Sequence, residues 1–182
     1  MKKARFSRLF IGAVLLVALL YALYVLLLPK RGEVIERWET GNEGFRIRVT
    51  AYNEKNTFPA HGGGYYVFES AGIGSETWNK ILTFRHDDPV TIPKDQINYV
   101  SEEIAYVFMG WMYGVTTDGG EHWSVWDARH DLPQWQCCNY GLIESVELNS
   151  NGTGTMRLHV ISASRGEVPE LRTSDYGRNW FR

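Results

Sequence analysis

The sequence predicts an all-β domain of antiparallel hairpins that follows one N-terminal transmembrane helix. The first observation is an apolar run without charges over residues 9–28. The second is that, beyond residue 41, short segments of alternating apolar and polar residues are separated by Gly-, Asn- and Pro-containing turns. The third is a turn motif that occurs twice. Because no stretch after residue 31 keeps an apolar period of about 3.6 residues, we expect no long helix in the domain.

The composition is that of a folded globular chain whose charge is unevenly distributed. Of the 182 residues, 44% are hydrophobic and 22% are charged, which excludes a disordered chain, and 2 cysteines exclude a disulfide-framework mini-protein. The formal net charge is −2, but residues 1–31 carry 6 basic and no acidic side chains, which leaves 13 basic against 21 acidic side chains, or −8, in residues 32–182. Because the domain lacks a basic excess that would neutralise phosphates, we expect no nucleic-acid partner.

Residues 9–28 have the length of a membrane span. At about 1.5 Å per residue, a helix of this length covers about 30 Å, the thickness of the hydrocarbon core of a bilayer. The run exceeds the apolar part of a signal peptide, about 7–15 residues, and the following Pro29-Lys30 offers no small-residue cleavage site, so we expect an uncleaved anchor. Four basic residues precede the run and two follow it, which predicts a cytoplasmic N-terminus.

These features divide the chain into four predicted parts. We expect a cytoplasmic basic head at 1–8, a transmembrane signal anchor in contact with the lipid bilayer at 9–28, a linker at 29–40 and an exported β-domain at 41–182. The short basic head is typical of the bacterial inner membrane, which would make the domain periplasmic.

Strand segments are predicted from alternation, from β-branched and aromatic content and from the turn residues between them. In chain order they are 45–52, 65–68, 81–84, 97–100, 105–109, 112–117, 123–126, 142–148 and 155–161. Asn151-Gly152, which separates the last two, is a strong hairpin signal because both residues tolerate positive φ.

The repeated turn motif has the form [ST]-x-D-x-G-x-x-W. In this spacing the carboxylate accepts backbone N–H groups across the turn, the glycine supplies a positive φ, and the tryptophan folds back over the turn. A degenerate third copy over 72–78 lacks the aspartate and has its tryptophan displaced by one position. We therefore assign a structural role to Thr116, Asp118, Gly120, Trp123, Thr173, Asp175, Gly177 and Trp180.

On these motifs the chain resembles the Asp-box (BNR-type) repeat proteins, a family that includes sialidases, sortilin-type receptors and photosystem II assembly factors. The resemblance covers about residues 97–126 and 143–181 and implies hairpins between the outer strands of propeller blades. A blade takes about 40–50 residues, so the exported part has room for roughly three. The resemblance thus implies a partial propeller, a small sandwich, or an assembly completed by a second chain.

We expect no catalytic activity, cofactor or metal. Sialidase domains are more than twice this long, and the family's Arg-Ile-Pro signature is absent. His61-Gly62-Gly63-Gly64 matches an oxyanion-hole motif of lipases, but no G-x-S-x-G elbow accompanies it. The histidines, including His86, His122 and His130, show no metal-ligand spacing.

The two cysteines, Cys137 and Cys138, are adjacent. Neighbouring Cα atoms lie about 3.8 Å apart, below the usual disulfide span of about 4.4–6.8 Å, so a bridge between them would be strained. We expect a buried pair or a vicinal disulfide that shapes its loop.

Aromatic residues crowd the stretch 111–140, and Trp, Tyr and Arg are the residue types that dominate protein interfaces. We therefore expect a protein partner, with a basic surface that the acidic domain would attract. The candidate interface residues are Trp126, Arg129, Asp131, Trp135 and Tyr140.

The architecture also resembles that of type VI secretion lipase-immunity proteins, small periplasmic proteins that occlude an incoming effector. This resemblance implies an immunity protein that neutralises a secreted toxin. Two alternatives stay open. One is an assembly or scaffold factor for a membrane complex. The other is a glycan-binding or hydrolase module of the cell envelope, which would need polar residues such as His61, His86 or Asp131 to converge in one pocket.

Overall fold

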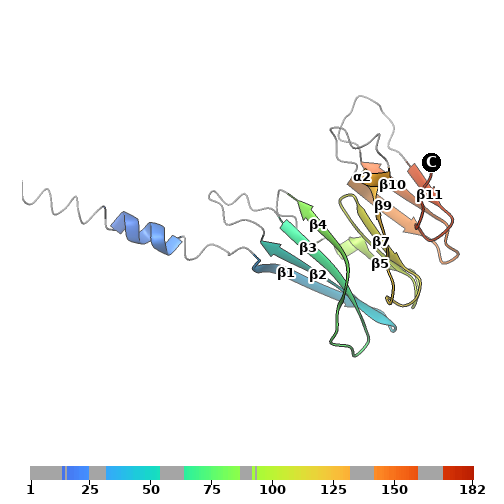
Figure 1. The fold of residues 1–182 in the computed structure, drawn as a ribbon, viewed down its shortest axis with the longest axis horizontal. Coiled ribbons are helices and arrows are strands. Elements are labelled where there is room, and N and C mark those ends of the chain that lie inside the picture. Colours follow the sequence, from blue (N-terminus) through green and yellow to red (C-terminus); the bar gives the residue numbers. More distant parts are fainter. Residues whose placement is uncertain are drawn as a thin grey trace, which may run out of the picture.

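A computed structural model of the chain (Figure 1) describes residues 14, 16–24, 32–53, 64–86, 92, 94–131, 142–159 and 170–182. Within this part of the chain, three antiparallel sheets follow one another along the sequence. Strands that are neighbours in sequence pair with each other, so each sheet is a meander. The domain is therefore all-β, as the alternating segments predict.

The described part of the predicted anchor is helical. Residues 14 and 16–24 are in a helix, and their side chains are exposed. No helix within the described ranges combines the length and the apolar character needed to cross a membrane. The other residues of the run 9–28 lie outside the described residues.

Sheet A has the order β1-β2-β3-β4. Its strands are β1 (Val34–Gly41), β2 (Phe45–Asn53), β3 (Gly64–Gly72) and β4 (Asn79–His86). Alternation over residues 45–49 of β2 buries Phe45, Ile47 and Val49 on one face and leaves Arg46 and Arg48 half-buried on the other. The domain begins earlier than the sequence predicts, because β1 takes up most of the predicted linker 29–40. Being an edge strand with an exposed outer face, β1 has no apolar alternation that would mark it.

Sheet B has the order β5-β6-β7-β8 and is the middle layer (Figure 1). Its elements are η1 (Lys94–Gln96), β5 (Ile97–Tyr99), β6 (Ala105–Met109), β7 (Met112–Thr116), β8 (Ser124–Asp127) and the short α2 (Ala128–Asp131). All five residues of β6 are buried, because each face of the strand packs against another sheet.

Sheet C has the order β11-β10-β9. Its strands are β9 (Leu142–Leu148), β10 (Gly154–His159) and β11 (Glu170–Thr173). The predicted hairpin between β9 and β10 is present, with Gly152 at φ 86°. An isolated bridge between Arg172 and Phe181 adds a fourth chain segment beside β11, so sheet C repeats the meander of sheets A and B in a shortened form.

Two hydrophobic cores hold the three layers together. The first lies between sheets A and B and contains Phe45, Ile47, Tyr66, Phe68 and Val107 among others. The second lies between sheets B and C and contains Phe108, Tyr113, Met156, Leu158 and Leu171 among others. Along β6 the side chains alternate between the two cores, so sheet B belongs to both.

Buried tyrosine hydroxyls also connect the layers. Tyr99 Oη of sheet B donates to the carbonyl oxygen of Thr40 in sheet A at 3.1 Å. Tyr106 Oη of sheet B donates to the carbonyl oxygen of Val146 in sheet C at 2.7 Å. Burial raises the pKa of Tyr106 to about 12, so its hydroxyl stays protonated and remains a donor.

Candidate functional site

The two motif turns occupy equivalent places in their sheets. Turn 1 (Thr116–Trp123) connects the third and fourth strands of sheet B, β7 and β8. Turn 2 (Thr173–Trp180) connects β11, the third strand of sheet C, to the bridge at Phe181. The degenerate copy at 72–78 connects β3 and β4, again the third and fourth strands of a sheet.

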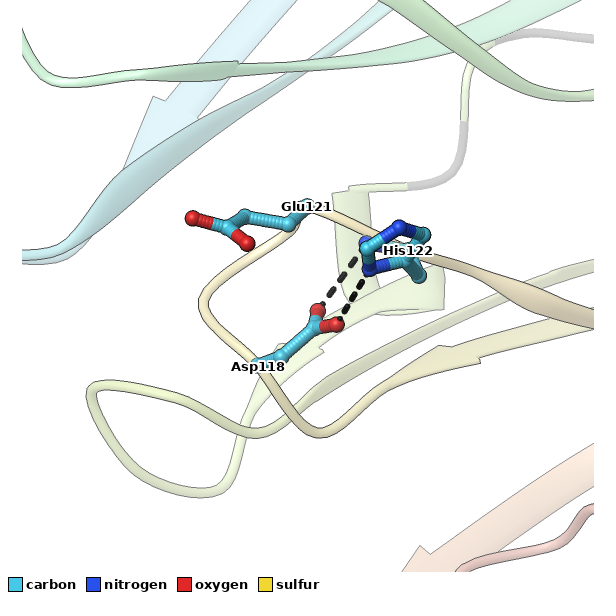
Figure 2. A group of neighbouring side chains, drawn as sticks. All are labelled: Asp118, Glu121 and His122. Atoms are coloured by element: carbon cyan, nitrogen blue, oxygen red, sulfur yellow. Dashed lines mark hydrogen bonds and ion pairs between the residues drawn. The ribbon is translucent and has the colours of Figure 1, made fainter.

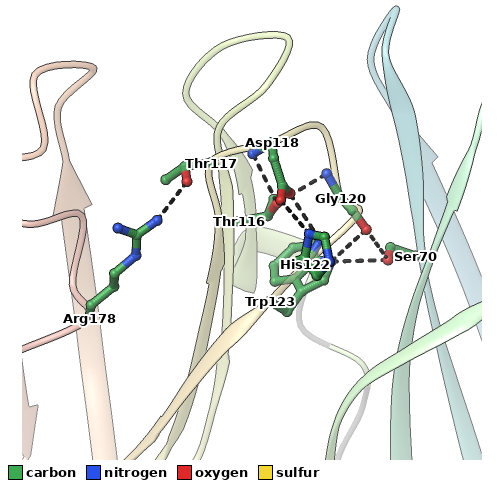
Figure 3. Close-up of polar contacts among 8 residues, drawn as sticks. All are labelled: Ser70, Thr116, Thr117, Asp118, Gly120, His122, Trp123 and Arg178. Carbon is green, nitrogen blue, oxygen red and sulfur yellow. Dashed lines mark hydrogen bonds and ion pairs between the residues drawn. The ribbon is translucent and has the colours of Figure 1, made fainter.

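Turn 1 is held by the hydroxyl of Thr116 and the carboxylate of Asp118 (Figure 3). Thr116 Oγ1 donates to Asp118 Oδ1 at 2.8 Å and accepts the backbone N–H of Gly120 at 3.0 Å. Asp118 Oδ1 accepts the backbone N–H of His122 at 3.0 Å, and Gly120 has a φ of 85°. The bond from the His122 N–H to the carboxylate and the positive φ of Gly120 are those that the motif predicts, whereas the two bonds of the Thr116 hydroxyl were not predicted.

Turn 2 repeats this geometry bond for bond. Thr173 Oγ1 donates to Asp175 Oδ1 at 2.8 Å and accepts the N–H of Gly177 at 2.9 Å. Asp175 Oδ1 accepts the backbone N–H of Asn179 at 3.0 Å, and Gly177 has a φ of 79°. Two turns that are far apart in sequence thus have the same hydrogen-bond geometry.

Asp118, Glu121 and His122 form a group whose ligand atoms lie within 4.8 Å of one another (Figure 2). Comparison with turn 2 explains the pairing of Asp118 with His122. His122 Nδ1 lies 2.8 Å from Asp118 Oδ2, and Asn179 Nδ2 donates to Asp175 Oδ2 at 2.6 Å in the same place. Because an amide, which is a poor metal ligand, replaces the imidazole in the second copy, His122 acts here as a hydrogen-bonding partner of the turn aspartate.

The turn carboxylates are held in their ionised form. Burial works to raise the pKa of Asp118, but hydrogen bonds from the backbone and ring of His122 and from Thr116 outweigh it and lower the pKa. Asp175 behaves alike, since hydrogen bonds from Asn179 and Thr173 outweigh burial and lower its pKa.

The tryptophans of the two turns dock on the preceding sheet in different ways. Trp123 Nε1 donates to Ser70 Oγ of sheet A at 3.0 Å and to the carbonyl oxygen of Gly120 at 3.2 Å. Trp180 packs edge-on against Tyr113 of sheet B, with ring centroids 5.4 Å apart. Within the described part of the chain, the buried Nε1 of Trp180 has no hydrogen-bond partner.

The degenerate copy accounts for the partner of Trp123. Ser70 occupies the position of Thr116 and Thr173 in its own turn, and Gly72 occupies the position of the aspartate. With no carboxylate at position 72, the Ser70 hydroxyl donates instead to the carbonyl oxygen of Gly120, at 3.1 Å, and accepts from Trp123. Because the aspartate is missing, the Ser70 hydroxyl is available for this contact between sheets A and B.

The opposite end of the stack carries the candidate interface. We call it the α2 edge: here β4 and β8 end, and the β6–β7 turn at Gly110 and Trp111 lies beside the start of sheet C. The N–H of Ile143 donates to the carbonyl oxygen of Gly110 at 2.7 Å, and the rings of Phe84 and Trp111 lie 4.8 Å apart.

Of the predicted interface residues, the structure places Arg129 at this edge. Its guanidinium lies 4.0 Å from the ring centroid of Trp111 and makes two hydrogen bonds to Asp127, at 3.2 and 2.9 Å. Trp111, which was not among the predicted interface residues, is therefore part of the same cluster. Its signal was present in the sequence, as a tryptophan directly after the turn glycine Gly110.

One predicted interface residue is a core residue. Trp126 is only 6% exposed and packs in the second core, with its ring centroid 6.4 Å from that of Trp180. In strand β8, Val125 and Trp126 lie on opposite faces, and Trp126 lies on the face that packs against sheet C.

The remaining predicted residues lie at the end of α2 or outside the described residues. Asp131 is the last residue of α2, and its side chain lies outside the described part. Trp135, Cys137, Cys138, Tyr140 and His61 lie outside the described residues.

Comparisons with protein-family models, with curated proteins and with solved structures found no match to this chain.

Proposed function

We propose that the chain is a membrane-anchored periplasmic protein whose β-domain binds another protein. In this proposal residues 9–28 span the inner membrane with the N-terminus in the cytoplasm, and the three meanders are the blades of a partial propeller of the Asp-box type. The repeated position of the turns, between the third and fourth strands of each sheet, supports the propeller interpretation.

The cluster of Trp111, Asp127 and Arg129 at the α2 edge carries the binding proposal. The Arg129 side chain is exposed, with 49% of its surface accessible, yet its guanidinium is fixed by Asp127 and by the indole ring of Trp111. A side chain already held in place loses little conformational entropy on binding, and Arg and Trp are frequent interface hot spots. The predicted contact residues Asp131, Trp135 and Tyr140 follow in the sequence.

The form of the proposal favoured by the small size, the anchor and the acidic domain is an immunity protein, which binds a secreted lipase-type effector with a basic surface. The group at Asp118 and His122, which a hydrolase would be expected to use, is accounted for by the geometry of the turn. This favours binding over catalysis.

The proposal is tested by affinity capture with the tagged full-length protein from detergent-solubilised membranes and periplasmic extract. We expect a specific protein to be retained, and the Arg129→Ala variant to bind it about tenfold or more weakly. Arg157→Ala, an exposed arginine on sheet C, is the matched control and should bind normally. Capture of nothing but glycan, with measurable turnover, would contradict the proposal.

The identity of the captured protein separates the two binding alternatives. A toxin whose lethality the full-length protein suppresses indicates an immunity protein, and a resident membrane complex indicates an assembly factor. Protease treatment of spheroplasts tests the topology: we expect the β-domain to be digested from outside, and protection of the domain would overturn the periplasmic assignment.

A further inference from the structure

The outer face of sheet A, the face turned away from sheet B, is basic although the domain as a whole is acidic. Alternation and register place five cations and two anions on this face. They are Arg37, Arg46, Arg48, Lys80 and Arg85, with Glu39 and Glu69. The face thus has a net charge of +3, whereas residues 32–182 together carry −8.

Aromatic side chains lie among these cations. The guanidinium carbons of Arg46 and Arg48 lie 4.9 and 4.0 Å from the ring centroid of Trp78. At the other end of the face, the rings of Tyr52 and Tyr65 lie 6.2 Å apart, and Arg85 lies 5.2 Å from the Tyr65 ring. Tyrosine and tryptophan combined with arginine and lysine are the residue types enriched at membrane–water interfaces.

The tyrosine end of the face is the end nearest the predicted anchor. One row across the sheet pairs Val34 with Tyr52, Tyr52 with Tyr65, and Tyr65 with Arg85. Five residues, 29–33, separate the predicted span from Val34, and they can reach about 20 Å at most. Val34 and Ile35, which open β1, are 44% and 53% exposed. An anchored chain therefore keeps Val34, the first residue of this row, within about 20 Å of the end of the predicted span.

We propose that the outer face of sheet A rests on the surface of the membrane in which the chain is anchored, where Arg37, Lys80 and Arg85 contact anionic phospholipid headgroups. Arg46 and Arg48 of the same face are ion-paired with Glu39 and Glu69, at 2.9 and 2.7 Å. This inference depends on the anchor of the proposed function. The charge of the face matches an anionic surface, and the Tyr52–Tyr65–Arg85 row supplies the amphipathic side chains that settle at headgroup level. Docking of this face would fix the orientation of the domain on the membrane.

The test uses the full-length protein in nanodiscs of phosphatidylcholine alone and of an equimolar mixture with phosphatidylglycerol. Lysines are acetylated with a water-soluble reagent and quantified by mass spectrometry. Lys80 lies on the outer face, and Lys94, which is also exposed and belongs to η1, is the internal reference. We expect the ratio of Lys80 to Lys94 labelling to fall severalfold in the anionic nanodiscs only.

The double variant Arg37→Gln/Arg85→Gln should restore labelling of Lys80, whereas Arg157→Gln/Arg172→Gln on sheet C should not. Thermal unfolding in detergent checks that both variants are folded. High labelling of Lys80 in both lipids would overturn the proposal. Low labelling in both lipids would also overturn it, because something other than anionic lipid would then cover Lys80.

Failure of the anchor gives a different result. A chain that does not co-float with vesicles of either composition contradicts the membrane anchor itself. A chain that co-floats but leaves Lys80 reactive contradicts only the docking of sheet A.

Discussion

At the scale of single residues, Trp123 and Trp180 hold the same place in two copies of one turn but differ in their hydrogen bonds. The indole N–H of Trp123 donates to Ser70 and Gly120, while that of Trp180 is buried without a partner in the described part of the chain. A buried donor without an acceptor lowers the free energy of unfolding by about 1–3 kcal/mol. The packing of the Trp180 ring offsets this loss.

This difference predicts opposite effects of removing the N–H group. Incorporation of 3-benzothienylalanine replaces the indole N–H by sulfur and nearly keeps the ring shape. At position 123 we expect a loss of about 1 kcal/mol in the free energy of unfolding, and at position 180 no loss or a gain. Urea unfolding of the two proteins measures both values, and an equal loss at both positions would show that Trp180 Nε1 has an acceptor.

The aspartates of the turns predict a second residue-scale effect, which depends on pH. Asp118→Ala removes the acceptor for the His122 N–H and should cost about 1–2 kcal/mol near neutral pH. Asp118→Asn keeps one acceptor oxygen and should cost less. The exposed Glu144→Gln is the matched control, and it should leave the free energy of unfolding within about 0.5 kcal/mol of its original value.

The direction of the pH effect follows from the lowered pKa of Asp118. The pKa of an aspartate in an unfolded chain is about 3.9. The pKa of Asp118 in the folded protein is lower, so the folded state favours the ionised form. The resulting stabilisation is present above the unfolded pKa and disappears as the pH falls through the folded pKa. We expect the difference in unfolding free energy between the parent and Asp118→Asn to shrink in this acid range. A difference that stays constant there would mean that the charge is irrelevant.

At the scale of elements, each motif glycine marks the contact of one sheet with the sheet before it. A Cβ atom on Gly120 would lie 2.7 Å from the ring of Phe45 in sheet A, and one on Gly177 would lie 2.6 Å from Tyr113 Oη in sheet B. Gly74 holds the corresponding place in sheet A, where a Cβ would meet nothing within 4 Å. Sheet A is the first layer in the described part of the chain, so no earlier described sheet packs there.

This comparison separates backbone strain from packing. Gly74 and Gly120 both have positive φ, 76° and 85°, so alanine at either position should cost about 1–2 kcal/mol of strain. Gly120→Ala should cost about 1–3 kcal/mol more, because the methyl group clashes with the ring of Phe45. Thermal or urea unfolding compares the two variants, and equal losses would contradict the close approach of turn 1 to sheet A.

Local patterns predicted the elements with strong alternation or strong turn chemistry. The bounds of β6 and β9 match the predicted 105–109 and 142–148. The backbone N–H bonds to the aspartates and the positive-φ glycines of turns 1 and 2 are also as the motif predicts. The strands β1 and β11 escaped prediction, because β1 is exposed on its outer face and β11 has one apolar residue, Leu171, in four.

Features that depend on how the sheets pack could not be predicted. The burial of Trp126 and the role of Ser70 as acceptor for Trp123 join segments that are distant in sequence. The basic face of sheet A was hidden for the same reason. Its cations are dispersed over residues 37–85, and only the pairing of β1 to β4 brings them together.

At the scale of the whole molecule, the middle position of sheet B makes the domain depend on both cores. The outer face of β10 in sheet C carries Arg157 and His159, which are exposed, while Met156 and Leu158 face the second core. With the charged outer face of sheet A at the other end, the stack of three sheets is bounded by polar faces on both sides. Among the described sheets, sheet B alone has an apolar core on each of its two faces.

This arrangement predicts that sheets A and B do not suffice for a stable fold. A chain that ends at residue 131 loses Met156, Leu158 and Leu171, each of which is 0% exposed, and burial of each contributes about 1.5–3 kcal/mol. Their loss, about 5–9 kcal/mol, approaches the whole stability of a typical domain, about 5–15 kcal/mol, and it also exposes Phe108 and Tyr113 of sheet B. We expect the shortened chain to bind a hydrophobic dye such as ANS and to lose cooperative thermal unfolding, with the full chain in the same detergent as the control. A shortened chain that unfolds in a sharp transition without binding dye would show that the first core is stable alone.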